Sequence, residues 1–198
     1  AGERRIGLLP GSRRQEIQRV LPAMLAAARE LRRRDPATAF LIPAASAEIR
    51  EQIARQLDTL PPEGRAAVAV VDGQMREILR QARAAMVCSG TATVETALLQ
   101  CPLIVVYRTA ALTYWFGRRI IRVPWLGMVN LIAGRELCPE FIQGAARSVA
   151  MADAVEALAA DTPERQVQLA GLAEVARSLE GRQGDIPSAG RLVAEALG

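Results

Sequence analysis

Short apolar runs alternate with longer amphipathic segments between residues 6 and 107, and this alternation constrains the fold more than any other feature. The runs are apolar throughout, as strands buried on both faces are, while the segments carry the three-to-four-residue spacing of helices. Strict strand–helix alternation favours an α/β fold, with a Rossmann-like parallel sheet and helices on both faces. The expected strands are residues 6–9, 39–42, 67–71, 84–88 and 103–107, and the expected helices are residues 14–34, 47–57, 75–81 and 91–99.

The last third of the chain is expected to be mostly helical. Helices are predicted over residues 152–160 and 162–179, the second with Thr162 as its N-cap and Pro163 at its first position. Residues 61–64 are expected to form a loop. We divide the chain into a domain of residues 1–180 and a tail of residues 181–198, whose short helix we expect to pack on another domain or subunit.

The amino-acid composition excludes several kinds of chemistry. The chain has no histidine and no lysine, so it cannot supply a Ser-His-Asp triad, a histidine-ligated zinc or a Schiff-base lysine. Any general acid or base must be a carboxylate, or must lie on another polypeptide. All 25 positive charges are arginines, and the net charge of +4 favours an anionic partner such as a nucleotide, a phospholipid or nucleic acid.

The first expected strand ends at Pro10-Gly11-Ser12-Arg13, immediately before the longest expected helix. A strand-to-helix turn presents free backbone N–H groups and the positive end of the helix dipole, which together attract a phosphate. Gly11 allows the backbone to approach a ligand closely, and Arg13 can grip a phosphate with two hydrogen bonds. The alternative is that Ser12 and Gln15 form a capping box and the turn binds nothing. The turn matches neither the P-loop nor the GxGxxG pattern.

A second strand-to-helix loop follows residue 88. Ser89, Gly90 and Thr91 offer backbone N–H groups and hydroxyls to a phosphate. Glu95, one turn into the helix, can accept hydrogen bonds from two vicinal hydroxyls, such as those of a ribose. The alternative is that Thr91 is a plain N-cap and Glu95 a surface charge that suits the helix dipole. Both loops leave the carboxyl end of a strand, where ligands bind at the point of strand-order reversal.

A third stretch, residues 130–143, sets polar residues among apolar ones, which is typical of the wall of a binding site. The polar residues are Asn130, Arg135, Glu136, Glu140 and Gln143. The alternative is a solvated loop followed by a helix that begins at Pro139.

Five of the seven aromatic residues lie between residues 107 and 125, interleaved with arginines. Such a segment is typical of a membrane interface with anionic lipid or of a dimer contact. The alternatives are stacking on single-stranded nucleic acid and a core helix with a basic outer face. We expect a membrane or partner surface that comprises Trp115, Phe116, Arg118, Arg119, Arg122 and Trp125.

No apolar run approaches the roughly 18 residues of a membrane span, and we expect no signal peptide. The three cysteines are Cys88, Cys101 and Cys138, and their spacing matches no metal-binding motif. We therefore expect buried thiols in a reducing cytoplasm.

Four segments, taken in order, resemble the lipid-A-disaccharide synthase family, which are GT-B glycosyltransferases of lipopolysaccharide synthesis. They are LLPGSRRQEI (residues 8–17), SGTATVETAL (89–98), VVYRTAALTYW (105–115) and NLIAGRELCPEFIQ (130–143). The resemblance covers nearly the whole chain and thins after Gln143. The first two segments alone would also fit related GT-B enzymes, such as a peptidoglycan N-acetylglucosaminyltransferase or a UDP-sugar epimerase, whereas the last segment is distinctive.

The resemblance implies a hexosyltransferase of lipid A biosynthesis. Such an enzyme transfers 2,3-diacylglucosamine from UDP-2,3-diacylglucosamine to a 2,3-diacylglucosamine 1-phosphate acceptor and releases UDP, with no metal or other cofactor expected. The implied donor site places Gly11, Ser12 and Arg13 on the diphosphate, Ser89, Gly90 and Thr91 near it, Glu95 on the ribose, and Asn130, Arg135, Glu136 and Gln143 along the wall.

Enzymes of this family also have an N-terminal half that holds the acceptor and the catalytic carboxylate. The chain therefore resembles the donor-binding half alone, so we expect no catalytic residue in it and no turnover without the other half. The resemblance further implies a homodimer with exchanged C-terminal segments, on the cytoplasmic face of the bacterial inner membrane and without nucleic acid. A non-enzymatic basic module that binds an anionic membrane or nucleic acid is the other alternative.

Overall fold

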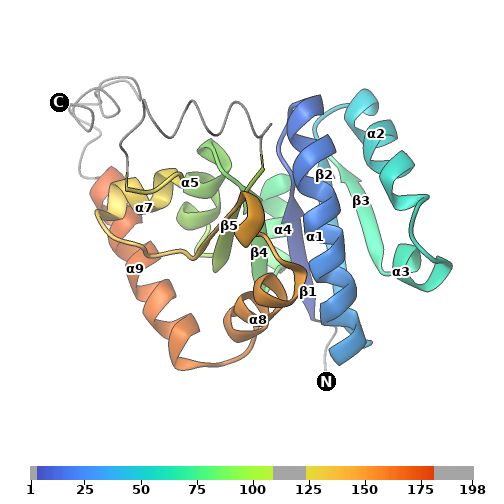
Figure 1. Ribbon diagram of the computed structural model, residues 1–198. Coiled ribbons are helices and arrows are strands. Elements are labelled where there is room, and N and C mark those ends of the chain that lie inside the picture. Colours follow the sequence, from blue (N-terminus) through green and yellow to red (C-terminus); the bar gives the residue numbers. More distant parts are fainter. Residues whose placement is uncertain (1–3, 109–123, 181–198) are drawn as a thin grey trace.

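The computed structural model describes residues 4–108 and 124–180, and its centre is a six-stranded sheet in the order β3-β2-β1-β4-β5-β6 (Figure 1). All neighbouring strands pair in parallel, which confirms the expected Rossmann-like α/β fold. The strands are β1 (Arg5–Leu9), β2 (Ala39–Ala44), β3 (Val68–Asp72), β4 (Ala84–Cys88), β5 (Leu103–Tyr107) and β6 (Glu140–Ile142).

Helices cover both faces of the sheet, and each face has its own hydrophobic core. The helices are α1 (Arg14–Arg34), α2 (Ala47–Leu57), α3 (Pro62–Ala66), α4 (Met75–Gln81), α5 (Thr91–Leu98), α7 (Met128–Ala133), α8 (Ser148–Ala159) and α9 (Pro163–Glu180), with a short 3-10 turn at Gln143–Ala145. Helices α1, α2 and α8 contribute to one core, and α4, α5, α7 and α9 to the other (Figure 1).

Strand β4 shows why the central runs are apolar throughout. Its residues alternate between the two cores: Met86 and Cys88 pack under α1 and α8, while Ala85 and Val87 face the opposite layer. All four side chains are buried. A strand with helices on both faces has no solvent-facing position, so a period of two in hydrophobicity is absent.

The structure corrects three expectations. Residues 61–64 are not only a loop, because Pro62 begins the short helix α3 and its fixed φ suits a first helical position. No helix begins at Pro139, which instead leads into β6, whose Phe141 pairs with Val106 of β5. Helix α8 begins at Ser148, four residues earlier than expected.

Other expectations are confirmed. Thr162 caps α9, since its hydroxyl accepts a hydrogen bond from the backbone N–H of Arg165 at 3.2 Å. None of the described helices combines the length and the apolar character that crossing a bilayer requires. The tail of residues 181–198 lies outside the described residues, so its packing stays a prediction.

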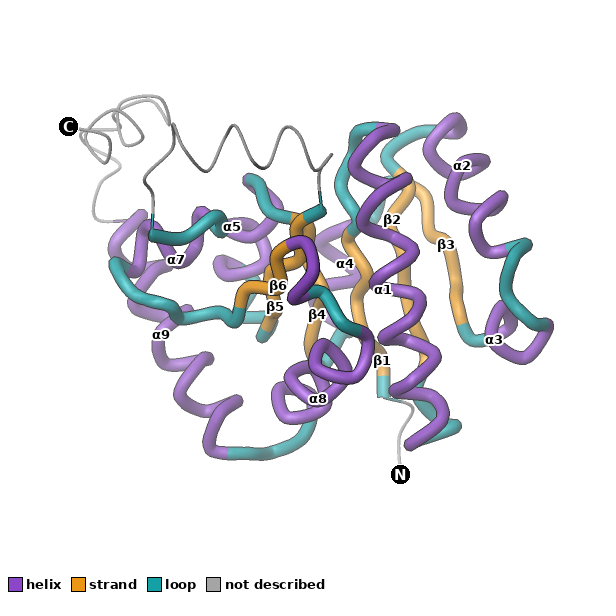
Figure 2. The backbone as a smooth tube through the Cα atoms, in the orientation of Figure 1, coloured by secondary structure: helices purple, strands orange, loops and turns teal. Residues whose placement is uncertain are grey.

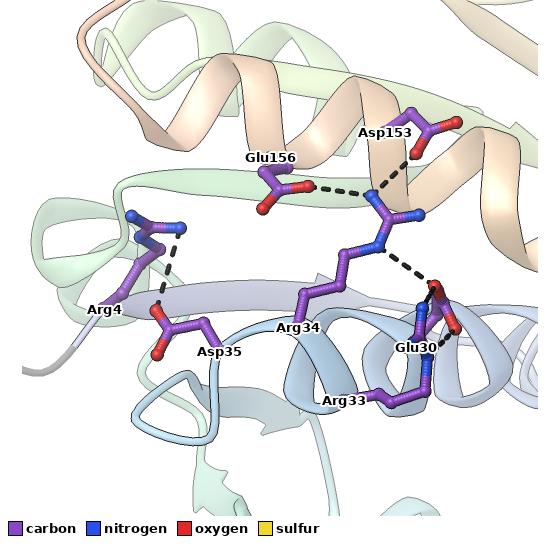
Figure 3. Close-up of polar contacts among 7 residues, drawn as sticks. All are labelled: Arg4, Glu30, Arg33, Arg34, Asp35, Asp153 and Glu156. Atoms are coloured by element: carbon purple, nitrogen blue, oxygen red, sulfur yellow. Dashed lines mark hydrogen bonds and ion pairs between the residues drawn. The ribbon is translucent and has the colours of Figure 1, made fainter.

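A network of ion pairs joins the end of α1 to α8 (Figure 3). The Arg34 guanidinium donates to Asp153 at 2.7 Å and to Glu156 at 2.8 Å, and its Nε donates to Glu30 at 3.0 Å. Glu30 also accepts two hydrogen bonds from Arg33, at 2.8 and 3.0 Å. The network fixes α8 beside α1, although Glu156 follows Arg34 by 122 residues.

Replacing Glu30 with glutamine is expected to destabilise the protein at neutral pH and progressively less in acid. Hydrogen bonds from Arg33 and Arg34 lower the pKa of the Glu30 carboxyl from its usual 4.5 to about 2. A lowered pKa contributes stability that is complete above pH 4.5 and lost as the pH falls toward 2. Urea midpoints of the parent and Glu30→Gln should therefore differ most near pH 7 and converge near pH 2.

The control for this experiment is Glu77→Gln. The Glu77 carboxylate lies 3.9 Å from Arg80 in an exposed pair, and such pairs contribute little to stability. Its urea midpoint should match that of the parent at every pH. If Glu30→Gln lowers the urea midpoint by the same amount at every pH, the role given to the ion pairs is wrong.

Candidate functional site

The candidate site lies where the strand order reverses. From β1 the chain proceeds to β2 and β3 on one side, whereas β4, β5 and β6 follow on the other. Strands β1 and β4 are neighbours, with Leu9 opposite Val87, so the loops that leave these two strands lie side by side. Both loops lie at the carboxyl edge of the sheet, which is the upper edge in Figure 2. This is the expected position for a ligand in an open parallel sheet.

The first loop turns on Gly11, whose φ of +104° strongly favours glycine. A Cβ at this position would also collide with the carboxylate of Glu16. Arg13 is the N-cap of α1, so the capping box proposed for Ser12 and Gln15 is wrong. The helix begins one residue later than that box requires, because the backbone of Arg13 is still extended.

Glu16, in the first turn of α1, is a residue beside this loop that the sequence analysis did not single out. Its carboxylate accepts hydrogen bonds from the backbone N–H and from the guanidinium of Arg13, both at 3.3 Å. The side chain of Arg13 is 83% exposed, so its cation faces the solvent at the mouth of the site. A glutamate three residues after a helix N-cap is the usual partner of a capping box, and that spacing could have identified it.

The second loop turns on Gly90, with a φ of +148°. Nothing lies within 4 Å of where its Cβ would be, so the backbone borders open space. Gly90 is the N-cap of α5, and the alternative that Thr91 is the N-cap is therefore wrong. Thr91 is exposed at the first position of α5. The Ser89 hydroxyl donates to the carbonyl oxygen of Leu126 at 2.6 Å, which ties this loop to the segment before α7.

Cys88, at the end of β4, lies close enough to Glu16 for that carboxylate to affect the pKa of its thiol. Burial, and to a smaller extent the negative charge of Glu16 in the first turn of α1, raise the pKa of the Cys88 thiol to about 12. Cys101 and Cys138 are likewise buried and free, which confirms the expectation of buried thiols. In the part of the chain that the structure describes, no cluster of three His, Cys, Asp or Glu side chains could hold a metal ion.

Glu95 lies on α5, one turn after the second loop, and borders an open cavity of about 680 Å³ that the start of α4 also lines. One of its carboxylate oxygens accepts a hydrogen bond from the Nε of Arg76, at the start of α4, at 3.0 Å. The residues that line the cavity are Gly73, Gln74, Met75, Arg76, Glu77, Arg80 and Glu95. Arg76 is a second residue that the sequence analysis did not single out, and no local pattern marks a pair 19 residues apart.

Asn130, on α7, is fully buried and anchors the chain that enters β6. Its amide nitrogen donates to the Cys138 carbonyl oxygen and to Glu140, both at 2.8 Å. Its amide oxygen accepts from the backbone N–H groups of Leu137 and Cys138, at 3.0 and 2.8 Å. Glu140 in turn accepts from the N–H groups of Leu126 and Gly127. The side chain of Asn130 therefore has a structural role, because both its amide nitrogen and its amide oxygen bond to other parts of the chain.

The other expected wall residues occupy two places. Arg135 and Glu136 are exposed in the segment between α7 and the amino end of β6, and Arg135 pairs with Glu174 of α9 at 2.8 Å. Gln143 follows β6 at the carboxyl edge, with a φ of +51°.

Of the expected membrane or partner surface, the structure describes Trp125, which is half-buried. The remaining members of the expected membrane or partner surface, Trp115, Phe116, Arg118, Arg119 and Arg122, lie outside the described residues.

Comparison with known proteins gives one consistent result. The family model described as lipid-A-disaccharide synthetase matches residues 1–187. A lipid-A-disaccharide synthase of Koribacter versatilis is 41% identical over 175 residues, which are 88% of this chain and 44% of that protein. That of Myxococcus xanthus is 37% identical over 193 residues, 97% of this chain and 48% of that protein. The chain thus spans about half the length of these curated relatives.

Solved structures agree on the fold. A Thermobaculum terrenum O-GlcNAc transferase variant superposes with a TM-score of 0.60 at 13% identity, over 98% of this chain and 35% of that one. The apo structure of OtsA gives a TM-score of 0.58 at 10% identity, over 93% of this chain and 44% of that one. At such low identities these matches support the architecture and leave the chemistry to the site itself.

Proposed function

The chain belongs to the lipid-A-disaccharide synthetase family, and from this premise we propose that it is the donor-binding half of such a glycosyltransferase. In this proposal it binds UDP-2,3-diacylglucosamine and supports transfer of the diacylglucosamine to 2,3-diacylglucosamine 1-phosphate, with release of UDP. An N-terminal half supplies the acceptor site and the catalytic carboxylate. The enzyme acts as a homodimer at the cytoplasmic face of the inner membrane.

The observation that carries the proposal is the pairing of two glycine-turned loops at the point of strand-order reversal. Gly11 and Gly90 both have positive φ; Gly90 is the N-cap of α5, and Gly11 precedes the N-cap of α1 by two residues. A departing UDP gathers negative charge on its diphosphate. Two helix N-termini and the exposed guanidinium of Arg13 can stabilise that charge without a cation.

The polar groups around the second loop support the position of the nucleoside. Glu95 borders the open cavity one turn after Thr91, the residue that begins α5. A carboxylate at this place repels phosphate, yet it accepts hydrogen bonds well from a vicinal diol. We therefore assign the diphosphate to the Gly11 and Gly90 loops and the ribose to Glu95.

A calorimetric titration with UDP tests the proposal. The parent chain should bind UDP, and Glu95→Ala should weaken binding about tenfold, because hydrogen bonds to a charged group contribute about 1.5–3 kcal/mol. Glu77→Ala is the matched control, since Glu77 lines the same cavity from α4 and has no ribose assigned to it. That variant should bind UDP as tightly as the parent or slightly more tightly.

Two outcomes would overturn the proposal. One is the absence of UDP binding both to the chain alone and to the chain mixed with an N-terminal half from a relative. The other is binding of an anionic membrane or nucleic acid that weakens steeply with added salt and does not change when UDP is present. That is the result expected of a general basic module. Formation of disaccharide by this chain alone, from donor and acceptor, would contradict the assignment of the catalytic carboxylate to the other half.

A further inference from the structure

We propose that Arg76 is a positioning residue that orients Glu95 for the ribose and so sets the preference for ribose over deoxyribose. The inference rests on the proposed function, because it takes Glu95 as the group that accepts the ribose hydroxyls. Nothing in the sequence pattern places Arg76 in the site. The contact between α4 and α5 alone brings it there.

The geometry of the pair defines what Arg76 does. Its Nε donates to the Oε1 atom of Glu95 at 3.0 Å, from the second position of α4 to the fifth of α5. Among the described residues, no hydrogen bond or ion pair reaches the other carboxylate oxygen of Glu95. The pair therefore fixes one oxygen and leaves the second available in the cavity that both side chains line.

An oriented carboxylate matters more to a diol than to a phosphate. A free glutamate on a helix surface samples several rotamers, and each ribose hydroxyl requires an acceptor within about 3 Å and in line with its O–H bond. Holding Glu95 in one rotamer removes that entropic cost before the ligand arrives. Arg76 also places a positive charge beside Glu95, which reduces the repulsion between this carboxylate and the diphosphate.

The two effects of Arg76 can be separated by ligand choice. Compensation of charge acts equally on UDP and on 2′-deoxy-UDP, because both carry the same diphosphate. Orientation of Glu95 acts on UDP more strongly, since the deoxy ligand offers one hydroxyl instead of two. The ratio of the two dissociation constants is therefore the readout of positioning, and a merely structural role would leave this ratio unchanged.

Arg80 supplies a matched control from the same helix. It lines the same cavity, carries the same charge and pairs with Glu77 at 3.9 Å instead of Glu95. The side chains of Arg76 and Arg80 are 73% and 64% exposed, so alanine at either position should leave the fold intact. Equal urea midpoints for the parent, Arg76→Ala and Arg80→Ala would verify this.

The experiment measures the dissociation constants of UDP and 2′-deoxy-UDP by calorimetry. The parent should prefer UDP about tenfold, Arg76→Ala should reduce this preference to about twofold, and Arg80→Ala should keep it near tenfold. The double variant with Glu95→Ala should show the same preference as Glu95→Ala alone, because the two residues act as one unit.

The outcomes separate this inference from the proposed function. If Glu95→Ala abolishes the preference for UDP while Arg76→Ala retains it, the ribose site stands and the positioning role of Arg76 is wrong. If Arg80→Ala reduces the preference as much as Arg76→Ala does, general charge is the cause and the inference falls. If the parent fails to bind UDP, or if Glu95→Ala keeps the full preference, the ribose assignment fails and the inference fails with it.

Discussion

Replacing Arg13 with alanine should weaken UDP binding by about tenfold to a hundredfold, the largest effect expected of any single substitution in the site. Arg13 is the N-cap of α1, two residues after Gly11, so its guanidinium borders the loop to which we assign the diphosphate. A charge-assisted hydrogen bond to phosphate contributes about 1.5–3 kcal/mol, and 1.36 kcal/mol corresponds to a factor of ten. Calorimetric titration with UDP at fixed ionic strength gives the comparison.

Arg19→Ala is the matched control for Arg13. Arg19 is also exposed on α1, nearly two turns further along the helix, and its removal changes the net charge of the protein by the same amount. Its UDP affinity should stay within twofold of the parent. Equal weakening by the two substitutions would show that net charge, and not the position of Arg13, governs binding.

Replacing Asn130 with alanine should lower the free energy of unfolding by about 3 kcal/mol, the largest stability effect expected here. The substitution leaves the backbone N–H groups of Leu137 and Cys138 without their acceptor, in a part of the fold where Asn130 is fully buried. It also removes a donor to Glu140, which holds the segment at Leu126 and Gly127. Urea denaturation followed by circular dichroism measures the loss.

Gln166→Ala serves as the control for Asn130→Ala. Gln166 is an exposed amide on α9, and its removal should change the stability by less than about 0.5 kcal/mol. A loss of stability at Asn130 no larger than that would mean that water replaces the missing hydrogen bonds, and the anchoring role would be wrong.

Periodicity and helix-ending residues were enough to predict the long central elements. The expected bounds of α1 agree with the structure at both ends, because its apolar stripe is long and Asp35-Pro36 follows it. The same reasoning missed β6, since three residues are too few to display a period. It also missed α7, whose six residues carry no side-chain cap at the N-terminus.

Some features of the candidate site could likewise be predicted from the sequence, and others could not. The positions of Gly11 and Gly90 could be predicted, because a glycine between an apolar strand and a helix is a local signal. The structural role of Asn130 could not, since a polar residue among apolar ones fits a site wall and an internal anchor equally well. The distinction depends on which backbone groups the chain brings beside it, seven and eight residues later.

Contacts between side chains on different helices are the hardest features to predict from the sequence. Arg76 and Glu95 are 19 residues apart on two helices, and the angle between those helices decides whether the side chains meet. No residue pattern along either helix encodes that angle. The roles given to Glu95 and to the wall residues at Arg135, Glu136 and Gln143 remain predictions until ligand binding is measured.

The ion pairs between α1 and α8 have a consequence for how the protein is made. Arg34 leaves the ribosome 122 residues before Glu156, its partner on α8. At a synthesis rate of about 5–20 residues per second, α8 is therefore made roughly 6–24 s after α1, the helix that it covers. During that interval the buried stripe of α1, which includes Val20 and Met24, is incompletely shielded, so the nascent chain offers a binding surface to chaperones that the finished protein lacks.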